Sequence, residues 1–390
     1  MAPLLFSLPV EKNRRCDNDW LNVIAMILVF MFHLARYFDF EGWHVKNLVL
    51  SQGMSLWTGF FSQFIMPLFF FLSGVSSHES LRARNVAAYL GNRFKRLVIP
   101  LVFGTFVILI PLQVWVERVS HGQFKGGFFE FYPKYFEGFY AFGGNFAWMG
   151  LHLWYLEMLF IFTLITLPLF IMMKKDVMKS IISNMAAFFS KPAAISLMGL
   201  FLYFSELLVN LWPHGLGMRA FGGWSLLSYL VILCLGYVSA TEERFKEAML
   251  KNRYFSLAAA CLLSTLMFIC PIDIKPLGKT IAYIVHMFVR SFNCWFWLTA
   301  FIGFGKKYLD FSNSALFYVR EAVLPFYILH QTVIVVIGFY LIPLNVGVFI
   351  KYLILGVISF SIITIIYEFM VKRIDVLRFC FGMKHVGKSV

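Results

Sequence analysis

Residues 21–38 read LNVIAMILVFMFHLARYF, and this apolar run decides the fold class because it approaches the length that crosses a lipid bilayer. The preceding segment is short and polar, no small-residue cleavage site is associated with the run, and His33 lies in its second half. We therefore expect a retained first membrane span and not a cleaved signal peptide.

The rest of the chain repeats this pattern. Of 390 residues, 60% are hydrophobic and only 14% are charged, with a mean hydropathy of +0.76. No soluble core of this length needs so much apolar surface. The apolar runs fall at 20–38, 55–76, 97–116, 149–173, 193–212, 223–240, 254–271, 281–304, 318–341 and 346–371. The sequence therefore predicts an all-α, polytopic transmembrane bundle of about ten helices.

The net charge of +14 has a topological explanation. Nucleic acid is not an expected partner, because no polar stretch is long enough to form a basic soluble module. Counting Lys and Arg in alternate segments between the runs gives 23 on one side and 7 on the other. Because cytoplasmic loops carry the excess of basic residues, both termini are predicted to lie in the cytoplasm.

Three histidines lie inside apolar runs or at their edges: His33, His152 and His330. An ionisable side chain in hydrocarbon costs several kcal/mol, so it marks a candidate site by default. Counting along the spans places these imidazoles where two or three of them can converge in the outer half of the bundle. Imidazole suits proton transfer near neutral pH. A metal site is not predicted, because no span contains an HxxxH or HxxE pair, and simple hydrogen bonding between helices is the alternative role.

Other charged residues have two interpretations each. Glu157 is a candidate acid or base, a partner for a histidine, or an ion-pair partner for Arg290. Arg93, Lys95 and Arg96 stand at the cytoplasmic mouth of a span, where they are either positive-inside anchors or phosphate ligands.

The longest outer segment, 117–148, is rich in aromatic residues. It is either an interfacial loop that caps the bundle or a surface that binds carbohydrate, since aromatic faces offer an amphipathic contact.

Five motifs occur in order along nearly the whole chain. They are Asp19-Trp20-Leu21-Asn22 with His33, Phe70-Phe71-Leu72-Ser73-Gly74, Arg93 to Pro100, His152-Leu153-Trp154-Tyr155-Leu156, and Leu324-Pro325-Phe326-Tyr327-Ile328-Leu329-His330-Gln331. Together they resemble the membrane-bound acyltransferase 3 family and, within it, most closely the glucan-biosynthesis branch. The resemblance implies that residues 20–371 form the acyltransferase domain, between a cytoplasmic segment 1–19 and a basic cytoplasmic tail 372–390.

The resemblance also implies an activity. Members of this family transfer an acyl group, such as succinyl or acetyl, from cytoplasmic acyl-CoA to a carbohydrate hydroxyl outside the membrane. The essential histidine of the family corresponds to His33, its arginine pair to Arg93 and Arg96, and its late histidine to His330. One position departs from the family pattern, because Asn22 replaces a basic residue eleven positions before His33. Either a neighbour such as Arg15 or Arg290 supplies that charge, or the member is altered or inactive.

From these observations we expect an acyltransferase in a bacterial inner membrane, with acyl-CoA and an extracytoplasmic glycan as its substrates and the bilayer as its surroundings. His33 is expected to act as general base, with His152 or His330 as orienting or oxyanion partner and Glu157 as a further acid–base candidate. Arg93, Lys95 and Arg96 are expected to hold the CoA phosphates. The alternatives are a transporter of a glycan or lipid-linked sugar with a histidine proton relay, and a catalytically inactive scaffold.

Overall fold

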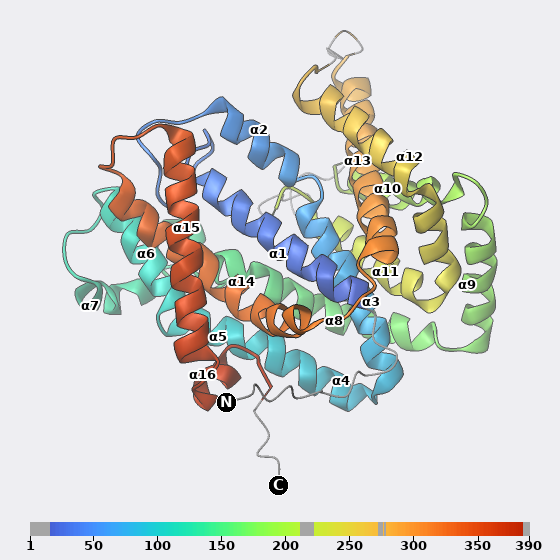
Figure 1. Ribbon diagram of the computed structural model, residues 1–390, viewed down its shortest axis with the longest axis horizontal. Helices are drawn as coiled ribbons and strands as arrows, with labels where there is room; N and C mark the ends of the chain where they lie inside the picture. The colour runs from blue at the N-terminus through green and yellow to red at the C-terminus, as the bar shows by residue number, and fades with distance from the viewer. Residues whose placement is uncertain (1–15, 211–221, 272–275, 277, 385–390) are drawn as a thin grey trace, which may run out of the picture.

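The computed structural model describes residues 16–210, 222–271, 276 and 278–384, and this part of the chain is helical (Figure 1). The main helices are α1 (Cys16–Arg36), α2 (Gln52–Phe61), α3 (Ile65–Ala83), α4 (Val86–Arg93), α5 (Ile99–Phe106), α6 (Leu109–Ser120), α7 (Phe128–Phe131), α8 (Trp154–Met172), α9 (Asp176–Phe189), α10 (Gly199–Asn210), α11 (Leu226–Thr241), α12 (Glu243–Phe268), α13 (Lys279–Tyr308), α14 (Ser314–Leu341), α15 (Val348–Ile366) and α16 (Asp375–Cys380). The described residues contain no β-strand, only an isolated bridge between Phe139 and Phe146.

The described parts of the ten predicted apolar runs are mostly helical, so the prediction of an all-α, multi-pass membrane protein is confirmed. Among the described residues, six helical stretches are long and apolar enough to cross a membrane, or seven if α11 and α12 are one span bent by 105°. The number falls below ten for physical reasons. Helix α10 has only 12 residues, and α13 carries His286, Arg290 and Asn293 within its apolar stretch.

Two polar contacts join segments that the sequence assigns to the same side of the membrane. On the predicted cytoplasmic side, Lys246 at the start of α12 forms a buried ion pair with Asp17 of α1. On the predicted outer side, the Lys351 ammonium at the start of α15 donates to the Asn47 side chain at 2.8 Å. The two groups of segments therefore form the two ends of one bundle.

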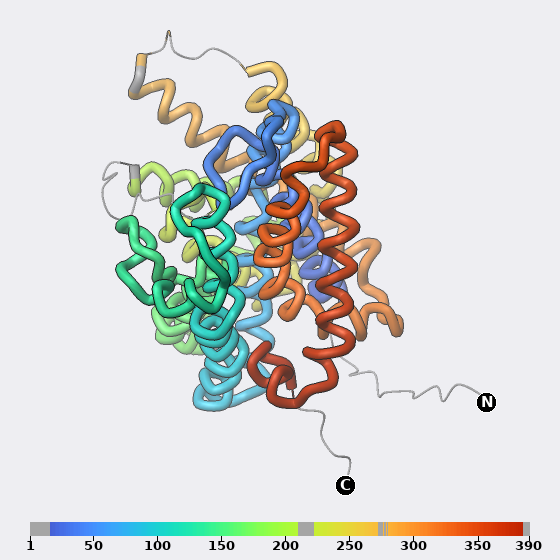
Figure 2. Tube along the Cα trace, turned by 90° about the vertical axis from the view of Figure 1, so that its left-hand side faces the viewer, coloured from blue at the N-terminus to red at the C-terminus, as the bar shows by residue number. Residues whose placement is uncertain are grey.

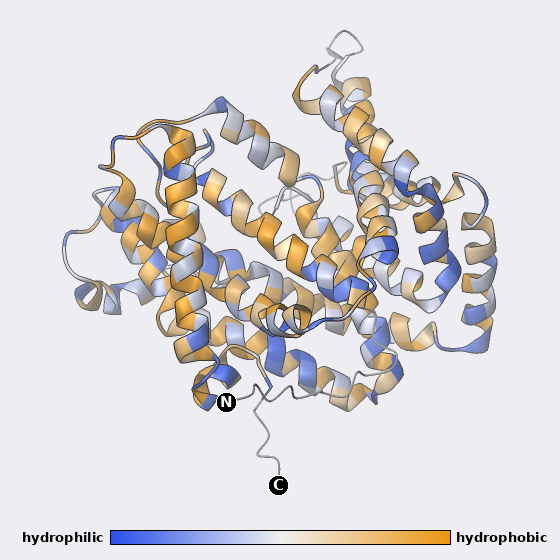
Figure 3. Cartoon of the chain, in the orientation of Figure 1, coloured by the Kyte–Doolittle hydropathy of each residue, from blue (hydrophilic) through white to orange (hydrophobic). Residues whose placement is uncertain are grey.

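Helix α14 lies at the centre of the part of the bundle that contains α1, α6 and α15. Every residue from Tyr327 to Val335 is buried, which is more than two full turns, so this stretch is covered on all sides. Helices α1, α6 and α15 pack around it, and α15 stands at the periphery (Figure 2). Apolar residues dominate α1 and α15, whereas polar residues are frequent on α4 and α9 (Figure 3).

Helices α3 and α11 pack with their backbones in close contact through two glycines. A Cβ atom on Gly74 of α3 would lie 2.0 Å from the Leu233 carbonyl oxygen, and one on Gly236 of α11 would lie 2.0 Å from the Phe71 carbonyl oxygen. Only glycine fits at such positions, as at many crossings of membrane helices. This contact fixes the segment of α3 that carries Ser73 and Ser77.

Candidate active site

Two of the predicted histidines meet in the centre of the bundle. The Nδ1 atom of His33 lies 3.1 Å from Nε2 of His330, and the two ring centroids are 4.9 Å apart. His33 comes from the outer half of α1 and is half-buried, whereas His330 lies on the fully enclosed part of α14. The structure thus joins two side chains that are 297 residues apart in the sequence.

The surrounding carbonyl groups assign the tautomers of neutral imidazoles at this pair. The Nδ1 atom of His330 faces the Tyr327 carbonyl oxygen at 2.6 Å, which only accepts, so this nitrogen carries the proton and Nε2 keeps a lone pair. The Nδ1 atom of His33 faces that lone pair and also the Val29 carbonyl oxygen at 3.0 Å. It is therefore the donor, and Nε2 of His33 is the basic nitrogen.

His152 lies beside this pair without joining it by a hydrogen bond. Its ring centroid is 5.2 Å from that of His330, and its Nε2 donates to the Ile328 carbonyl oxygen at 3.1 Å. Gly150 and Leu151, with φ values of 71° and 50°, reverse the chain just before it and direct the imidazole toward α14. Because a non-glycine residue rarely adopts positive φ, the backbone of this turn is strained at Leu151.

Polar and aromatic side chains continue from the histidines toward the cytoplasmic side. The Tyr327 hydroxyl donates to the His152 carbonyl oxygen, and the Tyr327 ring is 5.9 Å from the Tyr155 ring. The hydroxyl of Tyr155 pairs with the Ser73 hydroxyl at 2.6 Å. Arg93 then donates to the Ser77 hydroxyl at 2.6 Å. We call the series Arg93, Ser77, Ser73, Tyr155, Tyr327, His330 and His33 the polar line.

The three predicted cations, Arg93, Lys95 and Arg96, have different surroundings in the structure. Arg93 at the end of α4 points into the bundle, and its guanidinium also lies 5.4 Å from the Tyr89 ring centroid. Lys95 and Arg96 belong to the π-helical turn Phe94–Val98 and are exposed. Of the three, only Arg93 reaches the polar line.

Glu157 lies one turn into α8, half-buried, and its Oε2 atom is buried without a hydrogen-bond partner in the described part of the chain. Arg290 lies elsewhere, with its guanidinium 4.1 Å from the Trp224 ring centroid and a hydrogen bond to the Gly223 carbonyl oxygen. Neither the His152 imidazole nor Arg290 pairs with Glu157 in the described contacts.

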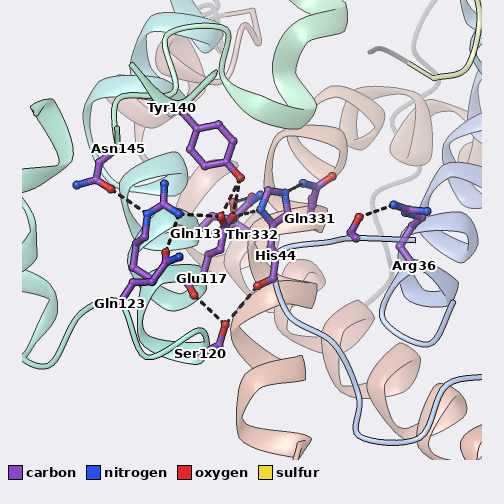
Figure 4. A network of polar contacts seen from close by, with 12 residues as sticks. Arg36, His44, Gln113, Glu117, Ser120, Gln123, Tyr140, Asn145, Gln331 and Thr332 are labelled. Atoms are coloured by element: carbon purple, nitrogen blue, oxygen red, sulfur yellow. Dashed lines mark hydrogen bonds and ion pairs between the residues drawn. The ribbon is translucent and has the colours of Figure 1, made fainter. Parts of the chain in front are cut away.

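A second polar cluster lies on the predicted outer side, and the sequence pattern did not predict it (Figure 4). The Nδ1 atom of His44, from the segment after α1, is hydrogen-bonded to the Glu117 carboxylate near the end of α6. The Tyr140 hydroxyl lies 2.9 Å from both oxygens of that carboxylate, and the Gln331 amide nitrogen lies 3.1 Å from Nε2 of His44. Because 73 residues separate His44 from Glu117, the spacing of residues in the sequence does not predict this contact.

The aromatic outer segment covers this cluster. Arg118 holds this segment in place through hydrogen bonds to the Asn145 side chain at 2.9 Å and to the Gly144 carbonyl oxygen at 2.8 Å. Phe129 and Phe142 remain 88% and 87% exposed, so the segment caps the bundle and still presents aromatic surface.

Sequence comparison identifies the family of this arrangement. The acyltransferase domain that defines the acyltransferase 3 family matches residues 18–368. The chain belongs to the acyltransferase 3 family. This acyltransferase is 23% identical to glucans biosynthesis protein C of Escherichia coli (strain SMS-3-5 / SECEC), with 97% of each chain aligned. It is 24% identical to the protein of the same name from Salmonella paratyphi B, with 97% of this chain and 96% of the relative aligned. No solved structure matches it.

Asn22 remains the departure from the family pattern in the acyltransferase. Its amide donates to the Asn18 carbonyl oxygen at 2.8 Å, one turn earlier in α1. Arg290 does not replace the missing charge, because it lies against Trp224 at the start of α11. Arg15, the other candidate, falls outside the described residues.

Proposed function

We propose that this acyltransferase moves an acyl group, succinyl or acetyl, from cytoplasmic acyl-CoA to a hydroxyl group of an extracytoplasmic glycan. The observation that carries the proposal is the tautomer of His33, whose basic Nε2 is held in place by His330 at the outer end of the polar line. The glycan acceptor is supported by the name of the full-length relatives, glucans biosynthesis protein C.

The proposed reaction uses His33 as general base. Its Nε2 takes the proton of the acceptor hydroxyl as that oxygen attacks the thioester carbonyl carbon. The carbon–sulfur bond then breaks, the acyl group stays on the acceptor oxygen, and the proton passes to the CoA thiolate. His330 orients the imidazole and stabilises the positive charge that forms on it, because its Nε2 lone pair accepts from Nδ1 of His33.

The remaining predicted residues take roles consistent with their positions. Arg93 and the exposed Lys95 and Arg96 offer cations to the CoA phosphates at the cytoplasmic end. His152 is better placed to fix α14 than to stabilise an oxyanion, because its Nε2–H group already donates to the Ile328 carbonyl oxygen. Glu157 stays a candidate acid–base group. The enclosed surroundings of His330 favour transfer over hydrolysis, since water competes poorly in a buried site.

Mass spectrometry of the extracytoplasmic glycans tests the proposal. The comparison uses a strain that lacks the protein, the same strain with the protein restored, and one that carries His33→Ala at equal membrane abundance. A mass increment that appears only with the intact protein is the expected result, and its size names the acyl group. Identical glycan masses in all three strains would contradict the proposal and favour transport without covalent change.

A further inference from the structure

The segment after α1 places an indole beside the proposed base. The Trp43 ring centroid lies 6.5 Å from that of His33 and 5.7 Å from that of His44, with interplanar angles of 31° and 55°. Trp43 is half-buried, so part of this residue remains accessible. The indole therefore lies beside both imidazoles.

His44 is held in one orientation by Glu117. The carboxylate is 5% exposed, and it also accepts hydrogen bonds from the Tyr140 hydroxyl at 2.9 Å and from Arg118 at 3.4 Å. Burial and the neighbouring carboxylate hold the pKa of Tyr140 well above its usual range, so the phenol remains a donor. An ionised carboxylate only accepts. In the neutral imidazole the Nδ1 atom of His44 is therefore the donor, and its Nε2 keeps a lone pair.

The lone pair on Nε2 of His44 faces Gln331, the residue that follows His330 on α14. The Gln331 amide nitrogen lies 3.1 Å from Nε2 of His44 and donates to it. Gln331 is 4% exposed, so its position is set by the surrounding helices. This contact ties the outer cluster to the turn of α14 that orients His33, and it places an acceptor and an amide side by side at the outer end of the polar line.

This combination has the chemistry of a sugar site. A sugar ring has an apolar C–H face that packs on an aromatic ring and hydroxyl groups at its edge that need donors and acceptors. Small-molecule sites generally combine aromatic walls with a few fixed polar groups. Trp43 supplies the wall, the Gln331 amide retains its oxygen and a second N–H beyond the bond to His44, and Nε2 of His33 is the base.

We propose that Trp43, His44 and Gln331 form the subsite for one sugar ring of the acceptor, with Glu117 as the positioning residue that fixes His44. The inference rests on the proposed function, and it locates the acceptor on the outer side of His33. The acceptor then approaches the base from the side opposite to Arg93, so donor and acceptor reach the histidines from different ends of the polar line.

Steady-state kinetics of the purified protein test the subsite. The acceptor is the unmodified glycan isolated from the strain that lacks the protein, and acyl-CoA is the donor. Trp43→Leu removes the ring and is expected to raise the KM for the glycan about tenfold, as the loss of an aromatic contact of this size predicts, while the KM for acyl-CoA changes less than twofold. Trp43→Phe keeps a ring and is expected to recover most of the affinity.

Two further variants separate positioning from packing. Glu117→Gln keeps an oxygen that accepts from His44 but removes the charge, so it is expected to raise the glycan KM less than His44→Ala does. Trp57→Leu is the matched control, because Trp57 is a 38% exposed tryptophan of α2, outside the aromatic outer segment. The control is expected to leave both KM values at the wild-type level.

The outcomes distinguish the subsite from the proposed function. If the wild-type protein does not acylate the glycan, the proposed function fails and the subsite fails with it. If the wild-type protein is active while Trp43→Leu and His44→Ala keep the wild-type glycan KM, the subsite alone is wrong. A rise in the acyl-CoA KM equal to that for glycan would also overturn it. If Trp43→Leu does not fold, the comparison of Trp43→Phe with His44→Ala decides.

Discussion

His330→Phe isolates the contribution of the orienting histidine. Phenylalanine keeps most of the buried volume, but it removes the acceptor that lies 3.1 Å from Nδ1 of His33. The Val29 carbonyl oxygen, 3.0 Å from the same nitrogen, still accepts, so the tautomer of His33 survives. The variant therefore loses one hydrogen bond to an imidazole that becomes charged in the reaction.

The size of the effect follows from that single loss. A hydrogen bond to a charged group contributes about 1.5–3 kcal/mol, and about 1.36 kcal/mol corresponds to a tenfold change in rate. We therefore expect kcat to fall about 10- to 150-fold in His330→Phe. His33→Ala removes the base itself and is expected to cost about 10²- to 10⁴-fold. His330→Gln retains an acceptor oxygen and is expected to lose less than His330→Phe.

The assay is release of free CoA thiol during glycan acylation by purified variants in detergent. Thermal unfolding and size-exclusion profiles confirm that the variants are folded. The ranking wild type, His330→Gln, His330→Phe, His33→Ala is the expected result. A kcat for His330→Phe equal to that of the wild type would refute the reasoning, and so would a His330→Gln variant as slow as His330→Phe.

Two further predictions concern donor binding and helix packing. Arg93→Ala is expected to raise the KM for acyl-CoA more than Arg96→Ala does, because Arg93 enters the bundle and contacts Ser77 whereas Arg96 is exposed. Initial-rate kinetics with varied acyl-CoA measure this difference. If Arg93→Ala raised the KM for glycan as much as the KM for acyl-CoA, Arg93 would be a structural anchor. Gly74→Ala is expected to destabilise the protein by about 1–3 kcal/mol, as forced overpacking does, since its Cβ would meet the Leu233 carbonyl oxygen. Gly91→Ala, where a Cβ meets nothing within 4 Å, is the control in the same thermal unfolding measurement, and equal stability of the two variants would contradict the packing argument.

The fold class and the central histidines follow from the sequence because the bilayer imposes simple constraints. Apolar runs of sufficient length have few alternatives to membrane helices, and His33 and His330 stand out because an imidazole in such a run is costly. The hydrogen bond between them was not predictable, since it depends on how α1 and α14 are rotated about their axes.

Other parts of the site depend on features that residue spacing does not encode. Arg93 and Arg96 are three residues apart, which on an α-helix would place them on one face. The π-helical turn that begins at Phe94 has i→i+5 hydrogen bonds and so more residues per turn, which changes the direction of the following side chains. Arg93 therefore contacts Ser77 inside the bundle while Arg96 is exposed. His44 and Glu117 lie at span ends, where charged residues are common, and only tertiary packing brings them together.

The glycine contact between α3 and α11 has a consequence for how the protein moves. Helices whose backbones touch at two reciprocal points cannot slide past one another without collision, so α3 and α11 behave as a single rigid body. Ser73 and Ser77, which contact Tyr155 and Arg93, are fixed to that body. Any conformational change in this protein therefore carries Ser73 and Ser77 together with α11.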